Sequence, residues 1–177
     1  MSGASQGDLQ RNLLCREMLL MGFVNSIIEI EAGLTYKQIR RIIESMKAEG
    51  LKIERKSRSC RSGATIIQSA ASRIQAGILM SLYKSISSQD IEKTLDLQGL
   101  TTAFRIYSGL REEASSTGAG RLAVIDITDA WCLAAELRSG EAILEYCDEC
   151  EVHYFTSVNQ RVSEACPFCR EEMLGIA

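Results

Sequence analysis

Four of the seven cysteines form two pairs whose spacing suits a metal ion. Two residues separate the cysteines of each pair and fifteen residues separate the pairs, which are Cys147 with Cys150 and Cys166 with Cys169. Because a two-residue gap lets a tight turn aim both thiolates at one ion, two such turns complete a tetrahedron of sulfurs about 2.3 Å from zinc. Four thiolates leave no position open for water. The spacing therefore predicts one structural Zn²⁺ per chain.

Free thiols and redox pairs are the alternative interpretations of these cysteines. Redox motifs of this spacing occur singly near a β-α-β pattern, and the sequence shows no such pattern, so zinc is favoured. His153 follows the second cysteine but is interpreted as a strand residue, because four cysteines already complete the site. Cys15, Cys60 and Cys132 share no spacing with one another and are interpreted as ordinary thiols.

Composition predicts a soluble, ordered chain with no catalytic function. The 177 residues are 46% hydrophobic and 24% charged, with a net charge of -3. No segment resembles a membrane span or a secretory signal, so we expect a cytoplasmic protein whose cysteines stay reduced. A single histidine, no glycine-rich phosphate loop and no nucleophile motif predict that the chain is not an enzyme. Asp126, Asp129 and Glu136 are expected on a solvated helix face, without a catalytic role.

Two N-terminal helices and the turn between them form the first recognisable element. Apolar residues three and four apart predict one long helix from Leu9 to Ile30, whose face is either core or an interface with a partner subunit. Thr35 with Gln38 matches a capping box that starts a second helix, and Gly50 is expected to end it. A helix, a short turn with a glycine and a basic helix are the arrangement of a helix-turn-helix.

Further helices are predicted before the cysteines, and strands beside them. Apolar periodicity predicts helices over residues 67–82, 90–110 and about 121–139, the last ending at Gly140. The apolar face of the first of these consists of Ile67, Ala71, Ile74, Ile78 and Leu82. Short alternating runs predict strands over residues 142–146 and 152–156.

These elements predict a mainly α fold in two domains. Residues 1–140 form the predicted helical body, which contains the helix-turn-helix-like segment at about residues 28–63. Residues 141–177 form a small zinc-ribbon-like module, because so short a segment makes no core of its own without a metal ion.

Positive charge is concentrated in and after the second helix. Between Leu34 and Arg61, nine basic and three acidic residues give a net charge of +6, so the rest of the chain carries -9. Such clustering on a helix-turn-helix is the electrostatic footprint of a DNA-binding surface, and a solvated basic face is the alternative. The residues predicted to contact DNA are Lys37, Arg40, Arg41, Lys47, Lys52, Arg55, Lys56, Arg58 and Arg61.

The order and gaps of several motifs resemble the FlhC family, a subunit of the bacterial flagellar master transcriptional activator. The resemblance covers about residues 95 to 170 and rests on Ala-Phe-Arg-Ile-Tyr at 103–107, Thr-Asp-Ala-Trp at 128–131, Ser139-Gly140 and the two cysteine pairs. Residues 33–50 agree in register, although individual side chains differ. The sequence departs from the family where residues 52–61 replace a proline-containing stretch, and where no long basic tail follows Cys169.

The resemblance implies a mostly helical subunit of a hetero-oligomer with an FlhD-type partner. Such a complex binds double-stranded promoter DNA of flagellar operons and recruits RNA polymerase, with no membrane involved. The resemblance also implies that the four cysteines are zinc ligands, whereas the basic residues correspond only as a region. The alternative function is a zinc-containing helical scaffold that binds proteins without contacting DNA.

Overall fold

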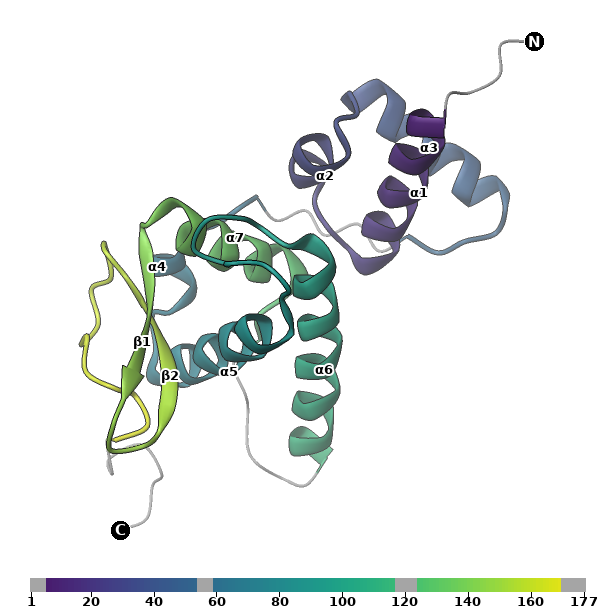
Figure 1. Cartoon of the computed structure of the whole chain (residues 1–177). Coiled ribbons are helices and arrows are strands. Elements are labelled where there is room, and N and C mark those ends of the chain that lie inside the picture. The colour runs from purple at the N-terminus through teal and green to yellow at the C-terminus, as the bar shows by residue number, and fades with distance from the viewer. Residues whose placement is uncertain (1–5, 54–58, 117–123, 170–177) are drawn as a thin grey trace. The chain divides into compact units, whose positions relative to one another are not determined.

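The computed structural model describes residues 6–53, 59–116 and 124–169. Seven helices and one antiparallel pair of strands lie in these ranges, which confirms the predicted mainly helical fold with a small C-terminal module (Figure 1). The chain divides into two compact units, the first ending at Cys60 and the second beginning at Arg61. Within the described ranges, no helix combines the length and the apolarity needed to cross a bilayer.

The first unit contains two helices where the sequence predicts one. Helix α1 spans Gln6–Met21 and helix α2 spans Asn25–Ala32. Between them, Gly22 adopts a φ of 88°, a left-handed conformation that interrupts the helical hydrogen bonds and that glycine adopts without strain. The prediction of an unbroken helix from Leu9 to Ile30 is therefore wrong, because its apolar period continues across a residue that turns the chain.

Helix α3, Tyr36–Ala48, begins as the sequence predicts. The Gln38 backbone N–H donates to the Thr35 hydroxyl over 3.4 Å, and the Thr35 backbone N–H donates to the Gln38 side-chain oxygen over 2.9 Å. This reciprocal capping box satisfies N–H groups that the first turn leaves unpaired. Gly50 follows the helix with a φ of 82°, as expected of a glycine that ends a helix.

The three helices of this unit pack on a shared apolar core. Contacts join every pair of them, and the core includes Cys15, Met18, Ile27, Ile28, Ile39 and Met46. The predicted apolar face of α1 is only partly inside, since Leu9, Leu13 and Leu20 each expose more than half of their surface. These leucines lie about 40° or less apart around a helix of 3.6 residues per turn, and so share one face.

The second unit is built around helix α5, Ala70–Ile86, which follows the short helix α4, Gly63–Ile66. The predicted inward residues Ile74, Ile78 and Leu82 are only half-buried. The buried residues of α5 are Ser72, Arg73, Gln75, Ala76, Gly77, Leu79, Met80 and Tyr83. Of the predicted face only Ile67, just before α5, is fully buried, because α5 contacts helices and strands on several sides and its polar residues are enclosed too.

Two longer helices complete the helical part of this unit. Helix α6 spans Leu97–Ser116, and so begins seven residues after the predicted start at Asp90. Residues 90–96 instead form turns, and the Asp96 carboxylate accepts the Gly99 backbone N–H over 2.9 Å near the helix start. Helix α7 spans Ile127–Ser139 and ends at Gly140, which has a φ of 75° as predicted.

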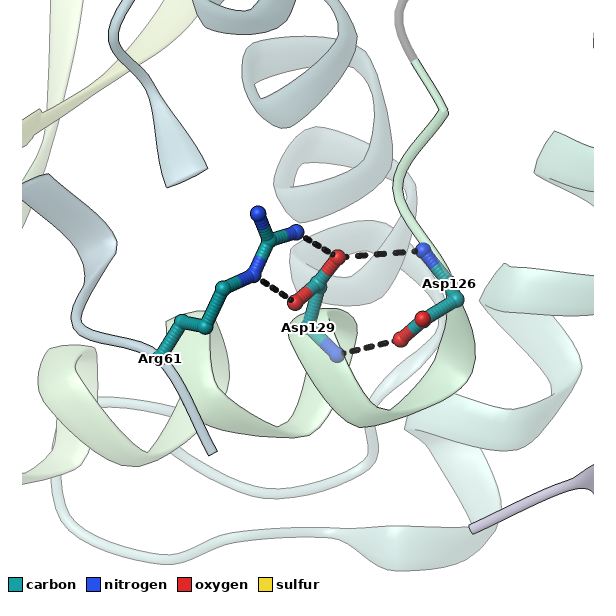
Figure 2. Close-up of polar contacts among 3 residues, drawn as sticks. All are labelled: Arg61, Asp126 and Asp129. Carbon is teal, nitrogen blue, oxygen red and sulfur yellow. Dashed lines mark hydrogen bonds and ion pairs between the residues drawn. The ribbon is translucent and has the colours of Figure 1, made fainter. Parts of the chain in front are cut away.

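A carboxylate cluster at the start of α7 is buried, contrary to the expected solvated face. Asp126 caps the helix by accepting the Asp129 backbone N–H over 2.9 Å. The side chain of Asp129 is only 2% exposed. Its two oxygens accept hydrogen bonds from Nε and from a terminal nitrogen of Arg61, over 3.0 and 2.5 Å (Figure 2). The expectation fails because Arg61, 68 residues earlier, supplies a partner that makes burial of the charge tolerable.

Glu136, two turns further along α7, also forms hydrogen bonds within the second unit. Its carboxylate accepts the Gly63 backbone N–H over 2.6 Å and the Ser157 hydroxyl over 3.2 Å. Burial raises the pKa of Glu136 above its ordinary value, and these two hydrogen bonds oppose that rise. Together with the Arg61 ion pair, these bonds hold α4 and the residues before it against α7.

The predicted strands form a hairpin that packs on the helices of the same unit. Strands β1, Ala142–Cys147, and β2, Val152–Ser157, pair in antiparallel register from Ala142 opposite Ser157 to Cys147 opposite Val152. The hairpin lies along α5 (Figure 1), and both Leu144 and Phe155 are buried. This packing makes the hairpin part of the second unit together with α4 to α7, whereas the sequence predicts a boundary between residues 140 and 141.

Candidate metal centre

The first cysteine pair occupies the turn of the hairpin. Cys147 is the last residue of β1, and Cys150 lies three residues later, before β2 begins at Val152. Glu151, which follows Cys150 and precedes β2, adopts a φ of 53°, a left-handed conformation uncommon for residues other than glycine. This tight turn brings both thiols to the same end of the hairpin.

The second cysteine pair is brought back to that end by the chain that follows β2. Residues 158–169 contain no helix or strand. This segment is fixed by local bonds, such as the Gln160 side-chain nitrogen donating to the Ser163 carbonyl over 3.1 Å. Cys166 is buried, and Cys169 is half-buried like both cysteines of the first pair.

All four thiols converge on one point. Their sulfur atoms lie within 4.8 Å of one another, and Cys169 Sγ is 3.3 Å from Cys147 Sγ and 3.2 Å from Cys150 Sγ. Four sulfurs about 2.3 Å from a tetrahedral zinc are about 3.8 Å apart, close to this spacing. The predicted set of four cysteines is therefore brought together, and it could hold one metal ion.

The thiols interact strongly enough with one another to change their acidity. The Cys150 backbone N–H, followed by the thiol of Cys169, lowers the pKa of Cys147 to about 7. Shared hydrogen bonds with Cys150 and Cys147 raise the pKa of Cys169, because deprotonating one thiol of the cluster disfavours deprotonating the next. A divalent cation would relieve this competition, since it favours all four thiolates at once.

The other thiols and the histidine lie outside this cluster, as predicted. His153 Nδ1 is 3.4 Å from the Glu145 carbonyl oxygen, and its ring meets Tyr146 edge-on with 5.1 Å between centroids. Cys15 and Cys132 are buried elsewhere and Cys60 is exposed. Within the described residues, the cluster of potential metal ligands consists of the four cysteines alone.

Five of the nine residues predicted to contact DNA are exposed on the first unit. Four belong to α3 and one follows it, namely Lys37, Arg40, Arg41, Lys47 and Lys52. On α3, Lys37 and Arg41 lie opposite the buried stripe of Ile39, Ile43 and Met46, and Arg40 and Lys47 lie at its flanks. Arg40 also forms an exposed ion pair with Glu44 over 3.3 Å, one turn along the helix.

The remaining four predicted DNA contacts are not among the described residues of the first unit. Arg55, Lys56 and Arg58 lie outside the described residues. Arg61 belongs to the second unit, where its guanidinium is held by Asp129 (Figure 2). That ion pair raises the pKa of Arg61, and it makes Arg61 a structural residue of the α7 cluster.

One residue beside the metal centre was missed by the sequence analysis. Arg73 on α5 is only 3% exposed and donates to the Ala165 carbonyl, directly before Cys166. The available sequence signal is that Arg73 is the single charged residue between residues 62 and 82. A charge isolated in an uncharged segment is a candidate for a specific buried partner.

Comparisons with known proteins identify no family for this chain. No protein-family model matches the chain, and none of the curated proteins does. The two cysteine pairs are the part of the sequence motifs that the structure brings together in space.

Proposed function

We propose that the chain is a zinc-stabilised, DNA-binding subunit of a transcriptional activator of the FlhC type. The convergence of four cysteine sulfurs within 4.8 Å carries the zinc part of this proposal. Four thiolates in a near-tetrahedral cluster favour zinc, and a closed four-sulfur site gives zinc a structural role. Cys147, Cys150, Cys166 and Cys169 would hold the ion, which would join the hairpin turn to the segment after β2.

A metal analysis tests the zinc part of this proposal. Protein purified without added chelator or metal should contain one zinc per chain, and replacement by Co²⁺ should give the absorption bands of a tetrahedral thiolate site. Cys60→Ser, which removes an exposed thiol outside the cluster, is the matched control and should keep the full zinc content. A chain that contains no stoichiometric metal would contradict the assignment.

The DNA part of the proposal is supported by the first unit. Helices α2 and α3 are joined by the three residues Gly33, Leu34 and Thr35, a turn length typical of a helix-turn-helix. In that motif the second helix enters the major groove. The exposed cations of α3 would then face phosphate and base edges, and the partner subunit, flagellar promoters and RNA polymerase follow from the family resemblance.

Mobility shifts over a range of salt concentrations test the DNA surface. With the FlhD-type partner present, Lys37→Ala/Arg41→Ala should weaken binding to flagellar promoter DNA at least about tenfold. The slope of log affinity against log salt should fall by about 2, because each lost phosphate contact removes about one released counterion. Lys84→Ala/Arg138→Ala, which removes two exposed cations from the second unit, should leave both quantities unchanged.

Two results would point instead to the protein-binding scaffold. The first is a wild-type complex that keeps its partner subunit but binds no promoter DNA. The second is a Lys37→Ala/Arg41→Ala variant with the affinity and salt slope of its control.

A further inference from the structure

One face of α5 contacts the hairpin and the segment that follows it, residues 142–169, at intervals of one helical turn. These residues are called the cysteine module below. Arg73 donates to the Ala165 carbonyl over 2.6 Å, and the Ser81 hydroxyl donates to the His153 carbonyl over 3.4 Å. Midway between them, a Cβ on Gly77 would lie 3.3 Å from that His153 oxygen. Residues 73, 77 and 81 are four apart, so they lie on one side of the helix. This side of α5 therefore packs closely against the cysteine module.

The contacts of this face reach both sides of Cys166 in the chain. Ala165 immediately precedes Cys166, and the ring of Phe168, between the two cysteines, would lie 3.5 Å from a Cβ on Gly77. A Cβ at position 77 would thus press on the His153 carbonyl of β2 and would touch the Phe168 ring at ordinary van der Waals distance. The absence of a side chain there lets the cysteine module approach the helix backbone closely.

Arg73 is the strongest of these contacts in chemical terms. Its guanidinium is charged at any accessible pH and is nearly enclosed, at 3% exposure. A hydrogen bond from a charged donor is stronger than one between neutral groups, particularly away from water. The bond therefore restrains the Ala165 carbonyl, and with it the backbone that enters Cys166.

We propose that Arg73 is a positioning residue for the metal centre, which fixes the Cys166–Cys169 segment in a ligand-ready conformation. The inference rests on the proposed zinc site. Residues 158–169 have no regular secondary structure, so ordering them costs conformational entropy. If no protein contact ordered this segment, that cost would be taken from the free energy of metal binding. Groups that orient metal ligands typically change metal affinity 10- to 100-fold. A zinc ion with four thiolates also carries a net charge of -2, which a nearby cation favours.

Zinc competition with a chromophoric chelator tests this role in the full chain. Arg73→Met keeps the aliphatic volume but removes the donor, so zinc affinity should fall about 10- to 100-fold while the helical circular dichroism is retained. The Co²⁺-loaded variant should show altered tetrahedral bands. Arg73→Lys, which keeps the charge and one donor, should recover part of the affinity. Lys84→Met, an exposed cation on the same helix, is the matched control and should bind zinc as the wild type does.

The outcomes separate this inference from the metal site itself. If the wild type binds one zinc but Arg73→Met matches Lys84→Met in affinity and Co²⁺ spectrum, the positioning role is wrong and the site stands. If the wild type binds no zinc through its thiols, the site itself is wrong. Should Arg73→Met fail to fold, Arg73→Lys takes its place in the comparison with Lys84→Met, since it keeps the charge but loses the planar guanidinium that donates to Ala165. Several-fold weaker zinc binding is then expected, and unchanged binding overturns the inference.

Discussion

Cys166→Ser is expected to abolish tight zinc binding and to unfold the segment after β2. Cys166 is the most enclosed of the four thiols, at 7% exposure, and its loss leaves three ligands and an open coordination position. Structural zinc sites contribute on the order of 10 kcal/mol of apparent binding free energy near neutral pH. Because residues 158–169 contain no helix or strand, only local hydrogen bonds and the α5 contacts hold them without the proposed metal.

Limited proteolysis and zinc analysis check this expectation. Cys166→Ser, and wild type treated with a strong chelator, should be cleaved rapidly within residues 158–165 and should lack bound zinc. Helical circular dichroism from α1 to α3 should persist, since these helices share a core within the first unit. Cys60→Ser should behave as the untreated wild type. Equal protease resistance of Cys166→Ser and Cys60→Ser would show that the metal does not hold this segment.

The second large effect is expected from the buried ion pair at the start of α7, and it should be asymmetric. Arg61→Met leaves the Asp129 carboxylate buried at 2% exposure without its cation, so it should lower the free energy of unfolding by about 3–5 kcal/mol. Asp129→Asn should cost less, about 2 kcal/mol, because the Arg61 side chain is already 33% exposed and can turn toward water.

Urea unfolding followed by Trp131 fluorescence measures both effects. This is the single tryptophan of the chain, it lies on α7 two residues after Asp129, and it is buried. The control is Asp90→Asn, which breaks an exposed ion pair with Lys93 in the same unit and should cost less than about 1 kcal/mol. The interpretation fails if Arg61→Met is as mild as Asp90→Asn, or milder than Asp129→Asn.

Local features of the sequence were sufficient for several elements. The capping box of Thr35 and Gln38 and the helix end at Gly140 involve residues within one or two turns of each other, so their types and spacing decide the outcome. The same holds for the hairpin, whose strands flank the first cysteine pair. The grouping of the two pairs was also predictable, because the spacing rule encodes the geometry of a tetrahedral ion.

Only the tertiary structure decided which residues far apart in the chain pair with each other. Arg61 was predicted to contact DNA and Asp129 to be solvated, yet 68 positions apart they neutralise each other. Arg73 meets Ala165 across 92 positions, and α5 is enclosed by helices and strands on several sides. Sequence periodicity reports which way a side chain faces on its own helix. It does not report which element packs there, and for a buried charge that neighbour determines whether the charge is tolerated.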